Sequence, residues 1–337
     1  ATAGTGGNDI ARFYDSTGND TLTVGPETVA MDYDPEVLDL AVTATGFRRV
    51  YAYSQNGGDD VANLSGSAGD DRFVARPESF YISLAGGKSN AQINGFKQVT
   101  VDVSPAEPGA DSGADYAYVY DSPESDVLTA GPAEAAMDYG ANTLIDVAML
   151  GFDRLYAYSE NGGFDEANLT GSPGIDSLNA DPDRCLMYHA ERTYRTDVRG
   201  FAVVTVDVSN TETPGDSAYI RDSQSDDLFI TNGQHATMNY GRDPWDNIVA
   251  IGFKNVLAYS ENGGDDAAML TGSAGLDEFY GFADKSYLRV DGRTYFHYAA
   301  GFSRVEATGA NLGNDIARLY GSASPTGDRF TASPERA

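Results

Sequence analysis

Basic and aromatic side chains able to take part in proton transfer gather in two stretches of the sequence, at 184–199 and 285–297. Counting back from the Gly-Phe dipeptide that follows each stretch aligns Arg192 with Arg293. A Tyr or His beside Arg can act as a base or acid, as a lyase of acidic polysaccharides requires. The candidate catalytic residues are Tyr188, His189, Arg192, Tyr194, Arg293, Tyr295 and His297.

These stretches also have a simpler interpretation, in which the cations balance neighbouring carboxylates on a solvated face. We favour it because a cluster of charges lacks the defined geometry of a site. The sequence contains no Gly-x-Ser-x-Gly elbow, no phosphate-binding Gly loop with Lys, no zinc spacing and no basic nucleic-acid patch. Enzymatic activity therefore stays an open alternative, and the sequence favours a protein that is not an enzyme.

Tyrosines alternate with small residues in several segments, as in Val50-Tyr51-Ala52-Tyr53-Ser54. If Val and Ala face inward, the Tyr rings point outward in a row, where they can stack on sugar rings or on a protein partner. The alternative, which we favour, is that each Tyr packs under a loop of its own unit. The candidate binding residues are Tyr51, Tyr53, Tyr156, Tyr158 and Tyr259.

Turns rich in Gly and Asp are the most specific local signal. The segment 66–74 reads Gly-Ser-Ala-Gly-Asp-Asp-Arg-Phe-Val, close copies start at Gly171 and Gly272, and a looser copy spans 15–22. These turns resemble the calcium-binding nonapeptides of haemolysin-type (RTX) repeat proteins of bacteria. The resemblance implies calcium as a cofactor, with Asp71, Asp176, Asp277 and Asp20 as ligands.

Each of these turns is isolated, whereas the nonapeptides of that family follow one another and share each ion. A lone turn supplies few oxygen ligands for calcium. The other interpretation is that Asp accepts hydrogen bonds from its own turn's amides and binds no metal, and the isolated spacing favours it.

The sequence is a repeat of about fifty residues. Its marker is Gly-Phe at 46, 95, 151, 200, 252 and 301, and Asn-Gly-Gly follows alternate units, which gives a larger period of about one hundred residues. We interpret 1–337 as a single repeat domain and place its units by residue range. They are 8–58, 59–114, 115–163, 164–215, 216–264, 265–313 and the partial unit 314–337.

Within a unit the apolar period is two, which indicates strands, and no helical pattern is found. Short strands, small inward residues and Gly-Asp turns predict an all-β parallel β-helix, or β-solenoid, whose coils bury a common interior. The alternative is a β-propeller, whose blades have about this length. The last unit repeats the start of the first instead of completing it, which favours the open stack.

The chain holds 51 Asp and Glu against 22 Lys and Arg, a net charge of −29. Such a surface repels nucleic acid and anionic membranes, and no apolar run is long enough to insert into a membrane. The single cysteine, Cys185, and the RTX-like turns lead us to expect an exported protein, extracellular or on the cell surface. The first residues continue a repeat pattern, so we expect a piece of a longer protein.

Two functions agree with these features. The leading expectation is a structural or adhesive extracellular module that stacks end to end into filaments or forms part of a surface layer or matrix, with neighbouring copies as partners. The alternative is a carbohydrate-active protein, either a module that binds acidic polysaccharide or a lyase.

Overall fold

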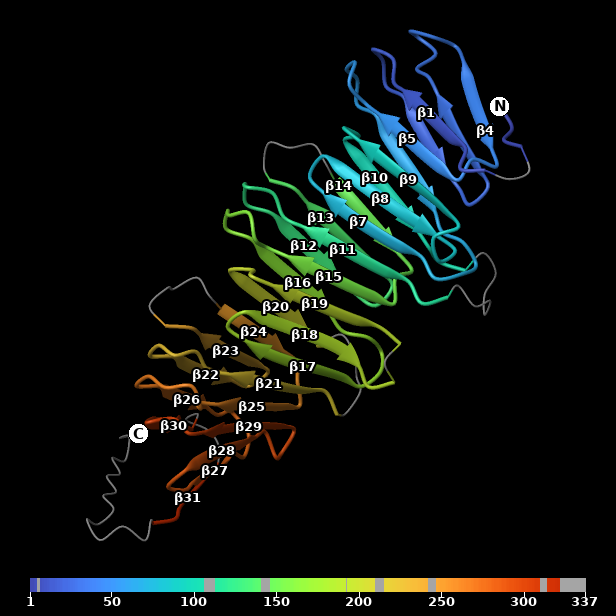
Figure 1. Cartoon of the computed structure of the whole chain (residues 1–337). Coiled ribbons are helices and arrows are strands. Elements are labelled where there is room, and N and C mark those ends of the chain that lie inside the picture. The colour runs from blue at the N-terminus through green and yellow to red at the C-terminus, as the bar shows by residue number, and fades with distance from the viewer. Residues whose placement is uncertain are drawn as a thin grey trace. The chain divides into compact units, whose positions relative to one another are not determined.

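The computed structural model describes residues 1–4, 7–105, 113–140, 146–191, 193–209, 215–241, 247–309 and 314–321 (Figure 1). The chain is a β-solenoid of about seven turns, built from stacked parallel strands, so the predicted solenoid is confirmed over the alternative propeller. The described residues form strands and turns without a helix, and none of their segments is a helix that could span a membrane.

Contacts group the chain into two compact units. The first unit comprises Ala1–Leu178 with Asp183–Thr213, and the second comprises Asn179–Pro182 with Pro214–Ala337. Each unit has two sheets, which we call sheet 1 (the sheet of β1) and sheet 2 (the sheet of β2).

In the first unit, the strands of sheet 1 lie in the order β1 (Ile10–Tyr14), β5 (Arg49–Tyr53), β9 (Ser89–Asn94), β8 (Ser79–Leu84), β7 (Arg72–Arg76), β11 (Tyr116–Tyr120), β15 (Arg154–Tyr158), β19 (Arg195–Arg199), β18 (Arg184–His189) and β17 (Asp176–Asp181). Those of sheet 2 lie in the order β4 (Ala41–Thr45), β3 (Thr28–Asp32), β2 (Thr21–Val24), β6 (Val61–Ser65), β10 (Gln98–Asp102), β14 (Asp146–Leu150), β13 (Glu134–Asp138), β12 (Val127–Ala130), β16 (Glu166–Thr170) and β20 (Val203–Asp207).

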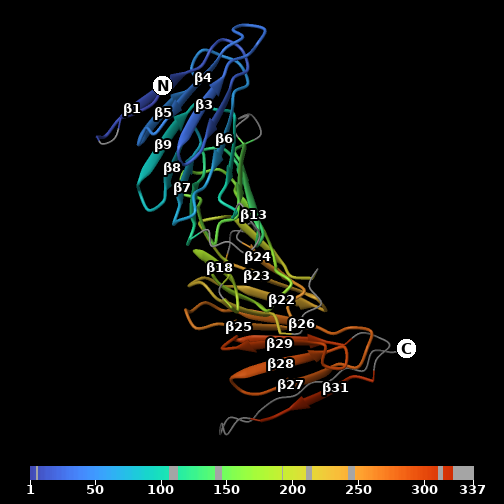
Figure 2. The same cartoon turned by 90° about the vertical axis from the view of Figure 1, so that its right-hand side faces the viewer.

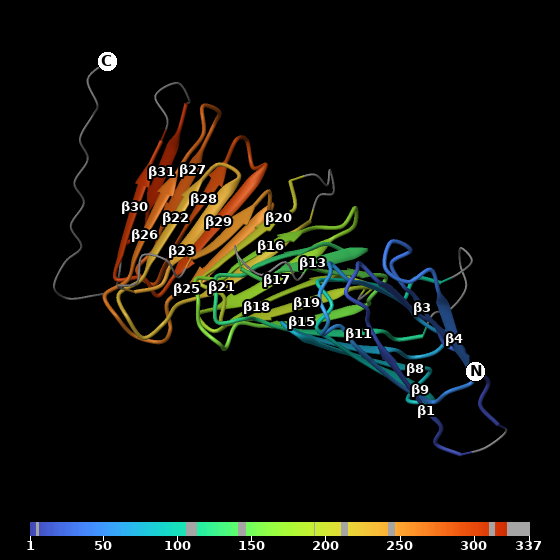
Figure 3. The ribbon, with the colours of Figure 1, turned by 90° about the horizontal axis from the view of Figure 1, so that it is seen from above.

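In the second unit, sheet 1 has the order β21 (Ser217–Arg221), β25 (Asn255–Tyr259), β29 (Tyr295–Ala300), β28 (Lys285–Val290), β27 (Glu278–Gly281) and β31 (Ile316–Leu319) (Figure 2). Sheet 2 has the order β24 (Asn247–Ile251), β23 (His235–Asn239), β22 (Leu228–Asn232), β26 (Ala267–Thr271) and β30 (Arg304–Thr308) (Figure 3).

The chain passes between the sheets in a ten-strand period. A single strand in one sheet is followed by an antiparallel three-stranded meander in the other, such as β2-β3-β4, and the next meander, β7-β8-β9, lies in the opposite sheet. Strands of successive coils pair in parallel, as β11 does with β7 and with β15. The alternation of meanders between sheets explains why the sequence repeats over about one hundred residues as well as fifty.

The core forms because most strands alternate between buried and more exposed residues. In β5, Val50 and Ala52 are buried, whereas Tyr51 and Tyr53 keep partial exposure on the outer face. The predicted inward direction of the small apolar residues is confirmed. The Gly-Phe marker is a turn: Gly95 has a φ of +81°, and a Cβ there would lie 2.1 Å from the Ser54 carbonyl oxygen, so a larger residue cannot replace it without movement.

Candidate functional site

The aspartates of the Gly-Asp turns are buried and hydrogen-bonded. The carboxylate of Asp71 accepts the Ser67 N–H at 2.6 Å, the Ser67 hydroxyl at 2.6 Å and the Ala85 N–H at 2.8 Å. Asp176 and Asp277 accept the same pair of bonds from Ser172 and Ser273. The metal-free interpretation of the turn predicts bonds of this kind, from the turn's own amides to the aspartate.

The same aspartates link consecutive coils. The N–H of Asp20 donates to the carboxylate of Asp60 at 2.6 Å, and that of Asp71 donates to Asp115 at 2.8 Å. Burial raises the pKa of Asp60, against hydrogen bonds from Ser54 and Asp20 that lower it. Within the described residues, no group of three or more His, Cys, Asp or Glu side chains is placed to hold a metal ion. Calcium binding therefore stays a prediction.

The structure divides the first basic stretch between two environments. The side chain of Tyr188, in β18, lies on the outer face of sheet 1, while Arg192 lies outside the described residues. Tyr194 is buried and donates its hydroxyl proton to Asp176 at 2.7 Å. His189 bonds the Thr193 hydroxyl through Nδ1 at 3.0 Å, and together with Tyr194 it lines an open groove of about 660 Å³.

The second basic stretch is divided as well. Arg293 lies in the β28–β29 turn and bonds Glu278, whereas Tyr295 is buried and lies under the ammonium group of Lys254. His297 points into the interior of the second unit. Burial lowers its pKa to about 4, although a hydrogen bond to the Gly233 backbone opposes the shift. The three candidates are not brought together as one site.

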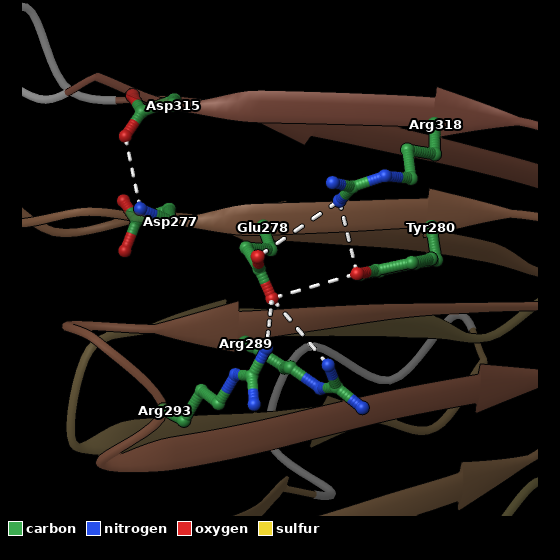
Figure 4. A network of polar contacts seen from close by, with 7 residues as sticks. All are labelled: Asp277, Glu278, Tyr280, Arg289, Arg293, Asp315 and Arg318. Carbon is green, nitrogen blue, oxygen red and sulfur yellow. Dashed lines mark hydrogen bonds and ion pairs between the residues drawn. The ribbon is translucent and has the colours of Figure 1, made fainter.

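Glu278 is the centre of a cation cluster on β27 (Figure 4). Arg289 and Arg293 donate to it at 3.4 and 3.3 Å, and Arg318 of β31 lies 3.9 Å from its other oxygen. Burial alone would raise the pKa of Glu278, but the bonds from the arginines outweigh that effect and lower it.

The outer face of sheet 1 in the first unit interleaves tyrosine and arginine. Tyr118 stacks on Tyr156 with ring centroids 5.1 Å apart, and Tyr120 stacks on Tyr158 at the same distance. We call this surface the Tyr/Arg face. Its residues, on β7, β11, β15, β18 and β19, are Arg72, Arg76, Tyr116, Tyr118, Tyr120, Arg154, Tyr156, Tyr158, Arg184, Arg195 and Arg199.

Arginine guanidinium groups lie over these rings. Arg76 is 4.3 Å from the Tyr120 ring centroid and Arg72 is 4.6 Å from that of Tyr118. Such contacts are cation–π interactions, and they keep each guanidinium beside a tyrosine ring of the face. The same pattern continues toward the start of the unit, where Tyr53 stacks on Tyr14 at 5.3 Å and Arg12 lies over Tyr51.

One buried carboxylate organises the basic end of the face. Asp197 accepts Arg184 at 2.5 and 2.8 Å, Arg195 at 2.8 Å and Arg199 at 3.2 Å, and its side chain is fully covered. Burial alone would raise the pKa of Asp197, but the bonds from the three arginines lower it to about 2. The cluster keeps an excess of positive charge.

The outer face of sheet 2 has the opposite character. None of its strands contains Tyr, and the only Lys or Arg in them is Arg304. We call the part in the first unit the acidic face. Its charged residues, on β10, β13, β14, β16 and β20, are Asp102, Glu134, Asp138, Asp146, Glu166 and Asp207. The first unit is therefore charge-segregated even though the whole chain is strongly acidic.

The candidate tyrosines Tyr51, Tyr53, Tyr156 and Tyr158 lie on the outer side of sheet 1, against Tyr and Arg of neighbouring strands. Tyr259, in the second unit, contacts Tyr298. Sequence reasoning missed Tyr116, Tyr118, Tyr120 and the arginines over them. The signal was present, because Tyr116-Ala117-Tyr118-Val119-Tyr120 has the same alternation as the segment around Tyr51.

Comparisons of this chain with family models, with curated proteins and with solved structures found no match.

Proposed function

We propose that this chain is an adhesive module of an extracellular repeat protein and that it binds acidic polysaccharide along the Tyr/Arg face. The observation that supports the proposal is the segregation of charge. In the first unit, the strands of sheet 1 carry eight arginines, six of which lie over tyrosine rings, while those of sheet 2 carry acidic residues and neither Lys nor Arg.

The chemistry of the face fits a chain of charged sugars. Arginine presents a planar fork of donors that matches a carboxylate, and a tyrosine ring offers a flat apolar body with a polar tip. Rows of these side chains run across the strands with the spacing of the sheet, about 4.8 Å. A linear polymer lying across the strands would therefore meet cations and rings repeatedly along its length.

The net charge of −29 does not prevent such binding. At physiological salt the screening length is about 8 Å, so a ligand on this face responds mainly to the arginines beside it. Binding rather than lyase chemistry is proposed because the candidate acid–base residues are not gathered into one site: Tyr194 is buried against Asp176, and His297 is buried in the second unit.

The test is a titration with polygalacturonate at fixed salt, with neutral dextran as the reference polymer. Arg154→Gln with Arg199→Gln should weaken polygalacturonate binding by about tenfold or more, because two charge-assisted contacts are lost. Thr100→Glu with Thr205→Glu changes the net charge equally on the opposite face and should leave binding within about twofold. Equal losses in both variants would contradict the proposal, as would tight binding of dextran.

The RTX-like turns add a separate proposal, of bacterial extracellular origin with calcium bound near Asp71, Asp176, Asp277 and Asp20. Calcium that binds only the folded chain raises its melting temperature, and a chelator reverses the rise. A melting temperature that is the same with calcium and with chelator would remove the ion from this account.

A further inference from the structure

The Tyr/Arg face and the acidic face of the first unit carry charges of opposite sign and similar size. With histidine neutral, β7, β11, β15, β18 and β19 hold six arginines and one aspartate, Asp197, a net charge of +5. The strands β10, β13, β14, β16 and β20 hold six carboxylates and no Lys or Arg, a net charge of −6. Arg72, Arg76 and Arg154 pair with no carboxylate of the described residues, so their charge is available to a partner.

On the Tyr/Arg face the charges lie in two rows, one at each end of the strands. In β7, Arg72 and Arg76 are four residues apart, and Arg195 and Arg199 repeat that spacing in β19. Arg154 continues the first row, because it pairs with Arg195. Four residues of a strand span about 13 Å, so the two rows of cations are separated by that distance.

The charges of the acidic face have the same separation. In β13, Glu134 and Asp138 are also four residues apart. Asp146 of β14 pairs with Asp138, and Asp102 of β10 pairs with Leu150, which in turn pairs with Glu134. The carboxylates therefore form two rows about 13 Å apart, the spacing of the arginine rows.

Between the rows the two faces differ in bulk. The middle of the Tyr/Arg face carries the stacked rings of Tyr118 and Tyr156. The corresponding row of the acidic face runs through Thr100, Ala148 and Ala136, which are small. An open groove of about 530 Å³ lies there, on β12, β13 and β14. Tyrosine rings of another copy could enter this groove while the charged rows meet on both sides of it.

The two faces point to opposite sides of the coil, because both sheets turn their other side to the buried core. A second copy displaced along the sheet normal therefore lays its acidic face on the Tyr/Arg face of the first. Sheets that pack face to face keep their strands within about 30° of each other, so the rows stay close across several strands.

We propose that copies of this chain associate side by side, the acidic face of one copy docking on the Tyr/Arg face of the next. The carboxylate rows accept hydrogen bonds from the arginine rows, and Tyr118 and Tyr156 enter the groove between the carboxylates. The contact is heterologous, so it leaves one face of each kind free and can continue. The inference goes beyond polysaccharide binding but uses the same Tyr/Arg face, so polysaccharide and a second copy compete for it.

The contact is small. The five strands of the Tyr/Arg face, each about five residues long, cover roughly 24 Å by 16 Å, so docking buries on the order of 800 Å² in total, the size of weak, transient contacts. The net charge of −29 also opposes association. At physiological salt, where the screening length is about 8 Å, distant charges are screened while the rows in contact attract. Association should therefore rise with protein concentration and weaken in high salt.

Sedimentation equilibrium of the full chain at physiological salt, up to about 1 mM protein, measures the association. Glu134→Lys with Asp138→Lys should weaken it by about tenfold or more, because like charges then face each other. Glu36→Lys with Asp39→Lys changes the net charge equally in an exposed turn and should leave association within about twofold. An unmodified chain that stays monomeric overturns the proposal, and so do equal losses in both variants.

A mixing experiment tests whether these two faces are partners. Arg72→Glu with Arg76→Glu makes the Tyr/Arg face acidic at two positions and should also prevent self-association. Mixed with the Glu134→Lys, Asp138→Lys variant, it should associate, because the mixture again offers an intact Tyr/Arg face and an intact acidic face. Recovered association also shows that both variants are folded. Folded variants that stay monomeric when mixed overturn the pairing.

Polygalacturonate separates this inference from the proposed function. The Glu134→Lys, Asp138→Lys variant keeps its Tyr/Arg face, so it should bind polygalacturonate within about twofold of the Glu36→Lys, Asp39→Lys control. Self-association of a chain that does not bind polygalacturonate would support the inference and contradict the proposed function. Polygalacturonate binding by a chain that stays monomeric would overturn the inference and leave the face to polysaccharide alone.

Discussion

The two outer faces of the first unit are built on nearly the same inner surface. Consecutive strands show this: β15 buries Leu155 and Ala157, and β16 buries Ala167 and Leu169. Outward, β15 carries Arg and two Tyr, whereas β16 carries Glu, Asn and Thr. The fold specifies only every second residue of a strand, so the other half is free to differ, and here it has diverged into a Tyr/Arg face and an acidic face.

The largest expected effect comes from His297, a titratable side chain on the inner side of the strands, where most buried residues are apolar. His297 is buried with its pKa lowered to about 4, so the unfolded chain, with a pKa of 6.5, binds the proton more strongly. Stability contributed by the neutral ring is present above pH 6.5 and is lost as the pH falls toward 4, by about 3 kcal/mol. His297→Leu should remove that loss.

Denaturant unfolding of both proteins at pH 7 and pH 4 measures the effect. The variant gains stability relative to the unmodified chain at the lower pH. If the two proteins differ in free energy of unfolding by the same amount at both pH values, the pKa of His297 does not change on folding, and the prediction is wrong.

The next effect tests whether the inward halves of the two sheets are equivalent. Ala157→Leu in sheet 1 and Ala167→Leu in sheet 2 both force a larger side chain into a packed interior, and each should lower the free energy of unfolding by about 2 kcal/mol. Similar midpoint shifts in urea are expected for both. If one sheet tolerates Leu and the other does not, the two inner surfaces are not interchangeable.

The sequence predicted which residues face the interior. The alternation in segments such as 50–54 predicted both the strands and the inward direction of their small residues, and the Gly-Phe dipeptides marked the repeat. The meanders were not predicted, because an antiparallel return such as β7-β8-β9 has the same period of two as a parallel coil. The Tyr/Arg face needed the register across strands: Arg76 and Tyr120 are far apart in sequence and meet only because β7 pairs with β11. Asp197 likewise lies among Arg in the sequence, but its complete burial follows from β18 folding back on β19.

A smaller effect separates the two outer faces. Asp197→Asn should lower the free energy of unfolding by about 1 kcal/mol, a value reduced from the full pKa shift because the surrounding arginines are partly exposed. The pKa of Asp197 is lowered to about 2, so its contribution is present above pH 4 and is lost as the pH falls through 2. On the acidic face, Asp207→Asn removes the charge but keeps an oxygen that can accept the Ser209 N–H, so it should cost less. Urea midpoints at pH 7 rank the two variants, and a larger loss for Asp207→Asn would reverse the comparison.

The smallest effect has the opposite sign. Asp138 and Asp146 lie directly opposite each other on β13 and β14 of the acidic face. Burial raises the pKa of Asp146, and the charge of Asp138 raises it further, so ionisation at neutral pH costs stability that is recovered as the pH falls. Asp138→Asn should therefore stabilise the chain by about 0.3 kcal/mol at pH 7, because like charges on paired strands repel. The gain should vanish near pH 3 and shrink in high salt, and a gain that is constant under both conditions would assign it to side-chain packing instead of charge.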